Sequence, residues 1–485
     1  MEPCDLDATH ARALIGRRAL SPVQLVESCI GRIEKTNGTV NALVDMDLDG
    51  ARAAARAAEA AVMAGAPLGP LHGLPLGVKD MVDAAGLRTT YGSPLFADNR
   101  AKVDERLVSL LRQAGAIVIG KTNVPEWSAG GNTVNEVFGP TRNPFDLAKT
   151  VSGSSGGSAA ALACGMVSLA TGSDTGGSLR NPAAYCGVVG FRPTPGLVAS
   201  EKRAMAWMQL STLGPMARSV ADVGLMLSVI AGFDARDPLS SLVDGALDAS
   251  RFAIPDRVDL SGLRVAATTD FGFAPTEAAI AALFGGRADG LAGLFHQLHW
   301  THPDCSGTDE AFAVLRAVLF LGRHLELLEA DPESIGPHVR ANVEEGLAYS
   351  ARDVARALDL QTRIQRRWHA FFQSHDLILS PAVTVSPRPW KEPYPAQIDG
   401  RPTRSYFHWL ALAYAATLAG HPAVVIPCGL DRNDMPFGLQ IIGPRGRDVF
   451  TLGAAAAIEA ALAANGFNGD VDRSALAEAL AQARE

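Results

Sequence analysis

Residues 150–194 read TVSGSSGGSAAALACGMVSLATGSDTGGSLRNPAAYCGVVGFRPT, with serines and glycines crowded between apolar runs. Two clusters stand out. Gly153-Ser154-Ser155-Gly156-Gly157 leads into the helix-like SAAALACG, and Asp174-Thr175-Gly176-Gly177-Ser178 follows the strand-like VSLATG. Glycine permits positive φ angles and close approach of the backbone, so successive N–H groups can point into one small concavity. Such a concavity suits either a phosphate or an oxyanion.

The spacing of these glycines disfavours a phosphate site, because neither G-x-x-x-x-G-K-[ST] nor a G-x-G-x-x-G after a first strand is present. A second interpretation takes residues 153–157 as a G-x-S-x-G nucleophile elbow, with Ser155 attacking. His408 and His421 lie late enough in the chain to supply its base. This α/β-hydrolase-type esterase hypothesis leaves the cluster at 175–178 unexplained.

Strand-like and helix-like segments alternate along the chain. Helical patterns cover residues 8–64, where Ser21 and Pro22 form a typical helix start, and also residues 306–374 and 472–485. The alternation favours an α/β layered fold with a mostly buried sheet in one domain spanning residues 1–485. Short apolar runs bounded by glycine or proline predict strands at 74–78, 116–119, 263–267, 377–379, 423–426 and 438–442.

Composition narrows the class of protein. The 485 residues carry 43 Lys plus Arg against 51 Asp plus Glu, a formal charge of -8 that disfavours a nucleic-acid partner. The six cysteines are scattered, which suits a reducing cytoplasm. The sequence has no export signal and no apolar run long enough for a membrane span. We therefore expect a cytoplasmic protein without membrane contact.

Several motifs together resemble the amidase signature family. They are PLHGLPLGVKD, GKTNVPEWSAGGNTVNEVFGPTRNP, GSSGGSAAALA and SDTGGSLRNPAAYCGVVGFRPT, followed near the C-terminus by LILSP, HPAVVIPCGL and GLQIIGP. The resemblance runs from about residue 25 to 218 and is faint between about 235 and 370. It implies a single large domain with a central mixed sheet covered by helices on both faces, in which residues 235–375 form a variable, mostly helical cover.

In that family a lysine, a serine joined through a cis peptide and a nucleophilic serine form the catalytic triad. The resemblance places these roles on Lys79 of GVKD, Ser154 of GSSGG and Ser178 of TGGS. The chain departs from the usual motif at Val151-Ser152, where Pro-Gly is usual, and at Arg192, where lysine is common.

The chemistry requires a neutral lysine. A serine hydroxyl attacks only after a base removes its proton, and none of the matched motifs around the serines holds a histidine. We expect burial beside hydroxyls to keep Lys79 neutral, so that it accepts the Ser178 proton through Ser154 and returns a proton to the leaving amine.

Residues around the triad have predicted supporting roles. The N–H groups of Thr175, Gly176, Gly177 and Ser178 are expected to bind the oxyanion. Asp174 and Arg180 are expected to form an ion pair that braces the glycine loop, and Ser155 to cap the following helix. Candidate substrate-binding residues lie in or near apolar and aromatic segments: Trp127, Gly130, Gly131, Met205, Trp207, Met208, Tyr406 and Phe407.

The resemblance implies a hydrolase of bulky apolar or aryl amides, with esters and carbamates as further substrates. We expect it to need no cofactor and to act as a monomer or homodimer. A glutamine-dependent amidotransferase subunit, working with a synthetase, remains the alternative. The evenly spaced His296, His299, His302 and Cys305 match no zinc signature, so we expect no metal.

Overall fold

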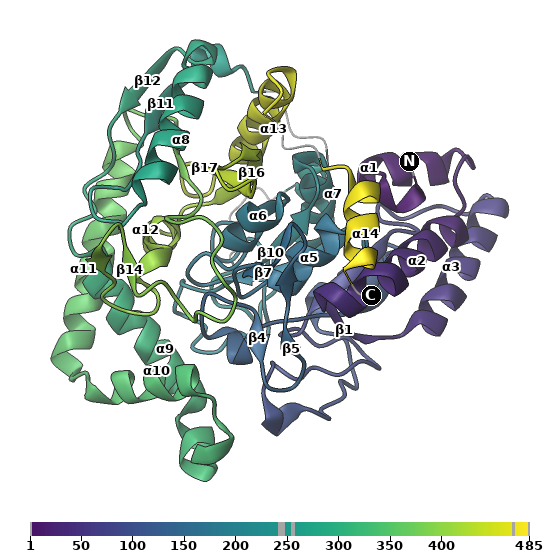
Figure 1. Cartoon of the computed structure of the whole chain (residues 1–485), viewed down its shortest axis with the longest axis horizontal. Helices are drawn as coiled ribbons and strands as arrows, with labels where there is room; N and C mark the ends of the chain where they lie inside the picture. The colour runs from purple at the N-terminus through teal and green to yellow at the C-terminus, as the bar shows by residue number, and fades with distance from the viewer. Residues whose placement is uncertain (1, 241–247, 254–257, 468–470, 484–485) are drawn as a thin grey trace.

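One mixed sheet of 11 strands runs through the molecule (Figure 1). The computed structural model describes residues 2–240, 248–253, 258–467 and 471–483. The strands of this sheet are β1 (Leu43–Met46), β2 (Pro75–Lys79), β3 (Ile117–Thr122), β8 (Leu169–Asp174), β9 (Val189–Arg192), β10 (Thr212–Ala217), β11 (Arg264–Ala267), β12 (Gln297–Trp300), β13 (Leu377–Pro381), β16 (Ala423–Leu430) and β17 (Pro436–Ile442). Their spatial order is β1-β3-β2-β8-β10-β9-β16-β17-β13-β11-β12.

Both parallel and antiparallel neighbours occur in the sheet. β2 runs parallel to β3 and β8, and β11 runs parallel to β12 and β13. The other neighbours are antiparallel. Three small two-stranded sheets pair β4 (Val134–Asn135) with β5 (Gly139–Pro140), β6 (Arg142–Asn143) with β7 (Asp146–Thr150), and β14 (Gln397–Ile398) with β15 (Arg401–Pro402).

Helices cover both faces of the large sheet, as predicted. Side chains alternate along a strand, and in β16 Val424 and Ile426 enter one hydrophobic core whereas Val425 enters another. α1, α4, α7, α8 and α13 pack in the first core, and α5 and α6 in the second. The described helices are α1 (Ala8–Gly16), α2 (Pro22–Val40), α3 (Leu48–Met63), α4 (Arg106–Gln113), α5 (Gly156–Ala163), α6 (Arg180–Cys186), α7 (Val220–Ile230), α8 (Ala278–Leu291), α9 (Thr308–Ala330), α10 (Pro337–Ala348), α11 (Ala351–Phe371), α12 (Ala411–Ala419), α13 (Asp448–Ala464) and α14 (Arg473–Gln482).

Most predicted elements are confirmed with small shifts at their ends, but the strand β1 interrupts the helical pattern predicted over residues 8–64. All six predicted strands exist, and the helical region 306–374 consists of α9, α10 and α11. α2 begins at Pro22, with Ser21 as N-cap in a capping box. α14 packs against α2, so the two ends of the chain lie side by side (Figure 1). No helix in the described ranges is long and apolar enough to cross a bilayer.

The topology brings the two glycine-rich clusters to one edge of the sheet. β2 and β8 are parallel neighbours, paired at Leu76 with Leu169 and at Gly77 with Ala170. Their carboxyl ends, at Lys79 and Asp174, therefore lie together. The loop that precedes α5 approaches the loop between β8 and α6 there, since the Ser155 N–H donates to the Ser178 carbonyl at 3.2 Å.

Candidate active site

Lys79 lies at the centre of a cluster of serine hydroxyls. Its side chain is fully buried, and its Nζ lies 2.7 Å from Ser154 Oγ, 2.9 Å from Ser173 Oγ and 3.0 Å from Ser155 Oγ. Its backbone N–H donates to Thr171 Oγ1 on the parallel neighbour β8 at 2.8 Å. A neutral amine offers two protons and one lone pair, so three hydroxyls can satisfy it without a carboxylate.

Burial lowers the pKa of Lys79 from its ordinary value to about 7, because the charged ammonium is removed from water. The Asp174 carboxylate opposes this shift through its negative charge. A large fraction of Lys79 is therefore neutral near neutral pH, which is the form that can accept a proton.

The loop that carries Ser154 has a specific backbone geometry. The Gly153–Ser154 peptide bond is cis, and Ser152 has a φ of 62°, in the left-handed region that favours glycine. Ser152 is buried, and its hydroxyl donates to the Gly131 carbonyl at 3.1 Å. Ser152 stands where glycine is usual, and its hydroxyl makes a hydrogen bond that glycine could not make.

The predicted capping role of Ser155 is wrong. Ser155 occupies the N-cap position of α5, but its side chain makes no capping hydrogen bond. Its Oγ is turned instead toward Lys79 Nζ and toward Ser173, whose N–H donates to it at 3.3 Å. The hydroxyl that would cap the helix is engaged by the lysine cluster.

Ser178 lies in the loop between β8 and α6 and is half-buried, whereas Ser154 and Ser155 are buried. Ser178 Oγ makes no hydrogen bond with another described residue. Of the three serines named from the sequence, Ser178 is the one that is partly exposed and whose hydroxyl has no partner among the described residues.

One of the four predicted oxyanion donors is already engaged. The Gly177 N–H donates to Asp174 Oδ1 at 2.9 Å, so Gly177 drops out of the predicted set. The N–H groups of Thr175, Gly176 and Ser178 donate to no other described residue. Gly177 has a φ of 112°, and a Cβ there would lie 2.5 Å from Ala413 Cβ, so its role is to shape the loop.

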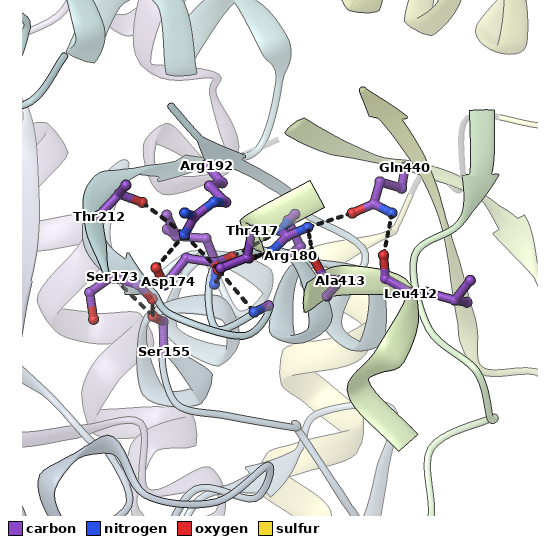
Figure 2. Close-up of polar contacts among 12 residues, drawn as sticks. Ser155, Ser173, Asp174, Arg180, Arg192, Thr212, Leu412, Ala413, Thr417 and Gln440 are labelled. Atoms are coloured by element: carbon purple, nitrogen blue, oxygen red, sulfur yellow. Dashed lines mark hydrogen bonds and ion pairs between the residues drawn. The ribbon is translucent and has the colours of Figure 1, made fainter. Parts of the chain in front are cut away.

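Asp174 and Arg180 form the expected ion pair behind this loop (Figure 2). Arg180 Nε and Nη2 lie 2.9 and 3.0 Å from the two carboxylate oxygens, and Arg192 adds a contact at 3.2 Å. Arg180 also donates to Gln440 Oε1 and to the Ala413 carbonyl, each at 2.7 Å. The network ties the glycine loop to β17 and α12.

The charges of this network stay fixed. Burial alone would raise the pKa of Asp174, but the Arg180 and Arg192 guanidiniums and the hydrogen bonds from Arg180 and the Gly177 N–H hold it well below its usual range. Asp174 is therefore an anion at any working pH and a poor candidate for proton transfer.

The geometry counts against the nucleophile-elbow hypothesis. Ser155 Oγ is buried and contacts Lys79 and Ser173, and neither candidate histidine is bonded to it. His408 contacts Arg404, and His421 Nδ1 lies 2.9 Å from the Gly443 carbonyl.

We expect Ser155→Ala to keep measurable amide hydrolysis, within about tenfold of the unmodified protein. The change removes one of three hydroxyls around Lys79 Nζ, a contact worth about 1 kcal/mol. Steady-state rates on an anilide measure the loss. An acyl adduct found on Ser155 by mass spectrometry would restore the elbow hypothesis.

A cavity of about 250 Å³ adjoins this cluster. Ser173 and Thr175 line the side of the cavity next to the cluster. The predicted substrate residue Trp127 also lines the cavity. The Trp127 ring is stacked on Tyr91, with centroids 4.3 Å apart. The remaining wall combines apolar residues, among them Met81, Leu213, Leu319 and Phe320, with a similar number of polar and charged ones.

The other predicted substrate residues lie outside this cavity. Gly130 lines a separate cavity of about 290 Å³, and Phe407 lines one of about 710 Å³. A Cβ on Gly131 would collide with the Trp409 ring, and the Tyr406 hydroxyl donates to Asn342 Oδ1 at 3.0 Å. Gly131 and Tyr406 therefore serve packing or local hydrogen bonding.

The loop around Trp207 also differs from the prediction. Trp207 is 81% exposed and lines none of the four cavities described, because its loop turns the ring outward. Met205 contacts α9, since its Sδ lies close to where a Cβ on Gly322 would be. Met208 is partly buried and packs against a hydrophobic core.

The predicted histidine series does not gather into a metal site. Among the described residues, Glu2, Cys4 and Asp5 are the one group with three potential ligand atoms close together, and Arg32 contacts both of its carboxylates. His299 and His302 have other partners, namely His375 and the Pro303 carbonyl.

We expect chelation to leave activity unchanged, because the proposed proton transfer needs no Lewis acid. Incubation with EDTA followed by an anilide assay measures this. Loss of turnover that zinc restores would contradict the expectation.

Sequence reasoning missed three residues of this site. Ser173 contacts Lys79, and its place two residues after Thr171 on the same face of β8 was a usable signal. Arg323 and His324 of α9 line the cavity, but they lie in the region where the resemblance is faint, and no local pattern marks them.

The chain is similar over most of its length to known proteins. The family model described as Amidase matches residues 24–452. The acylamidase of Rhodococcus erythropolis is 32% identical over 94% of this chain and 95% of its own length. A glutamyl-tRNA(Gln) amidotransferase subunit of Salinispora arenicola is 33% identical over 94% of this chain and 97% of its own length. A bacterial aryl acylamidase structure of the amidase signature family superimposes with a TM-score of 0.86 at 30% identity, covering 94% of this chain and 96% of that one.

Proposed function

This chain belongs to the amidase signature family of hydrolases that act on amides, and we propose that it is a free-standing serine amidase with Ser178 as nucleophile. Ser154 carries the proton between Ser178 and Lys79 in this mechanism. The observation that supports it most directly is the buried Lys79 amine, which lies 2.7 Å from Ser154 Oγ and forms no ion pair with any carboxylate among the described residues.

The reaction proceeds in two proton-coupled steps. Ser178 Oγ attacks the amide carbonyl while its proton passes through Ser154 to neutral Lys79. The N–H groups of Thr175, Gly176 and Ser178 stabilise the oxyanion, and one such donor is commonly worth about 3–4 kcal/mol. The Lys79 proton then returns through Ser154 to the leaving nitrogen, and water hydrolyses the acyl-enzyme.

The substrates we propose are bulky apolar or aryl amides. The aromatic and aliphatic walls of the cavity beside Ser173 and Thr175 support this class. Esters and carbamates present the same carbonyl to the same nucleophile, so slower hydrolysis of both is expected.

The purified chain tests this proposal against the amidotransferase alternative, which the relationship to amidotransferase subunits keeps open. We expect it to release aniline from a simple anilide without glutamine, ATP or another protein. Mass spectrometry should find the trapped acyl group on Ser178. Activity that appears only with a synthetase partner would favour the alternative.

A further inference from the structure

One face of α9 covers the candidate active site. The Phe312 ring lies 3.0 Å from where a Cβ on Gly176 would be, and Leu319, Phe320, Arg323 and His324 line the cavity beyond it. These positions recur at helical spacing, so a single helix contributes the outer wall of the cavity. α9 in turn packs against α10, α11 and α12, which fixes its position (Figure 1).

Arg323 is the cation on this wall that lacks an acidic partner. Its side chain is exposed at the cavity, and its guanidinium carbon lies 5.1 Å from the centroid of the Trp127 ring. No described residue accepts a hydrogen bond from it or forms an ion pair with it. The two other cations that line the cavity are paired, Lys202 with Asp83 and Arg203 with Asp237.

Buried polar atoms next to Arg323 also lack partners. Trp127 Nε1, which can only donate, and His324 Nδ1 have no hydrogen bond within the described part of the chain. Trp127 is 7% exposed and His324 1% exposed, so water does not readily replace the missing partners. Such buried groups call for an explanation, and beside an unpaired guanidinium at a cavity a bound ligand atom is one that fits.

Glu105, the one acid that lines the cavity, forms no ion pair with Arg323, although its charge acts on the guanidinium from a distance. The Glu105 carboxylate accepts the Asp83 N–H at 2.9 Å, on the Lys202 side of the cavity. A guanidinium over an aromatic ring, with the unpaired Trp127 N–H beside it, is suited to an anionic oxygen ligand.

We propose that Arg323, with Trp127, forms a subsite for a carboxylate of the substrate, so that the preferred substrates are amides that carry an anionic group on an apolar or aryl body. This inference rests on the proposed function and narrows its substrate class. Arg323 binds and orients the substrate, while the apolar wall holds its body.

Matched anilides test the subsite. The set is the anilide of pentanoic acid, the monoanilide of glutaric acid, whose carboxylate lies on the acyl side, and N-(4-carboxyphenyl)pentanamide, whose carboxylate lies on the amine side. We expect kcat/KM for at least one of the two carboxylate-bearing compounds to exceed that for the neutral anilide by about ten- to a hundredfold. Which of the two is favoured assigns the side of the scissile bond.

Arg323→Gln should bring this ratio close to one, chiefly through KM, and Arg323→Lys should restore part of it. The matched control is Arg366→Gln, an exposed arginine of α11 that lines none of the four cavities; it should leave the ratio unchanged. Thermal unfolding followed by circular dichroism checks that both variants fold.

Three results separate the possible failures. A neutral anilide cleaved as fast as both carboxylates overturns the subsite and leaves the proposed function intact. A preference that survives in Arg323→Gln overturns the role of this residue. No hydrolysis of any of the three compounds overturns the proposed function itself.

Discussion

Ser178→Ala should reduce anilide hydrolysis by the purified chain to background, a loss of about five to six orders of magnitude. Triad members act as a unit, and removing one nucleophile elsewhere costs on the order of a millionfold. Ser178 is partly exposed, and its own N–H and those of Thr175 and Gly176 donate to no other described residue and can hold the oxyanion. Initial rates of aniline release measure the loss.

Ser155→Ala is the matched control for this experiment, since it also removes one hydroxyl from the same pair of loops. The contrast of about 10⁴-fold or more between the two variants identifies the nucleophile. Retention of more than about 1% of the activity in Ser178→Ala would place the nucleophile elsewhere. Circular dichroism of both proteins excludes loss of fold as the cause.

Local patterns in the sequence were sufficient for most of the fold. Apolar runs bounded by glycine or proline predicted β2, β13 and β16, and the Ser21-Pro22 pair predicted the start of α2. β1 was missed because its four residues lie between two long helices and are only half-buried. The strand order could not be predicted, because pairing depends on contacts between segments far apart in the chain.

In the site too, features set by local sequence were predictable and features set by tertiary contacts were not. The motifs around Lys79 and Ser154 indicated two side chains that the fold brings to 2.7 Å. Hydrogen bonds that need tertiary structure were not predictable, and the Gly177 N–H, directed at Asp174, is one. Exposure was not predictable either. A tryptophan such as Trp207 is a residue type common in apolar pockets, but its side chain is largely exposed to solvent.

The rate of amide hydrolysis should depend on the charge of Lys79. The neutral amine is the active form, and its pKa is lowered to about 7 by burial. As pH falls below about 7 the amine gains a proton, the base is lost, and kcat/KM should fall about tenfold per pH unit. Burial also raises the pKa of Glu105, in the cavity wall, to about 7, so Glu105→Gln is the control: it should keep this acid limb.

Lys79→Ala should lose about 10³- to 10⁴-fold on an anilide and lack the acid limb near pH 7. On a 4-nitrophenyl ester, whose leaving group needs no proton, the loss should be smaller by about tenfold or more. The difference separates activation of Ser178 from protonation of the leaving nitrogen. Lys79→Met, which fills the space of the lysine stem, shows whether the loss comes from the amine or from an empty cavity. Equal losses on amide and ester would remove the general-acid role, and no loss on either would make Lys79 a structural residue.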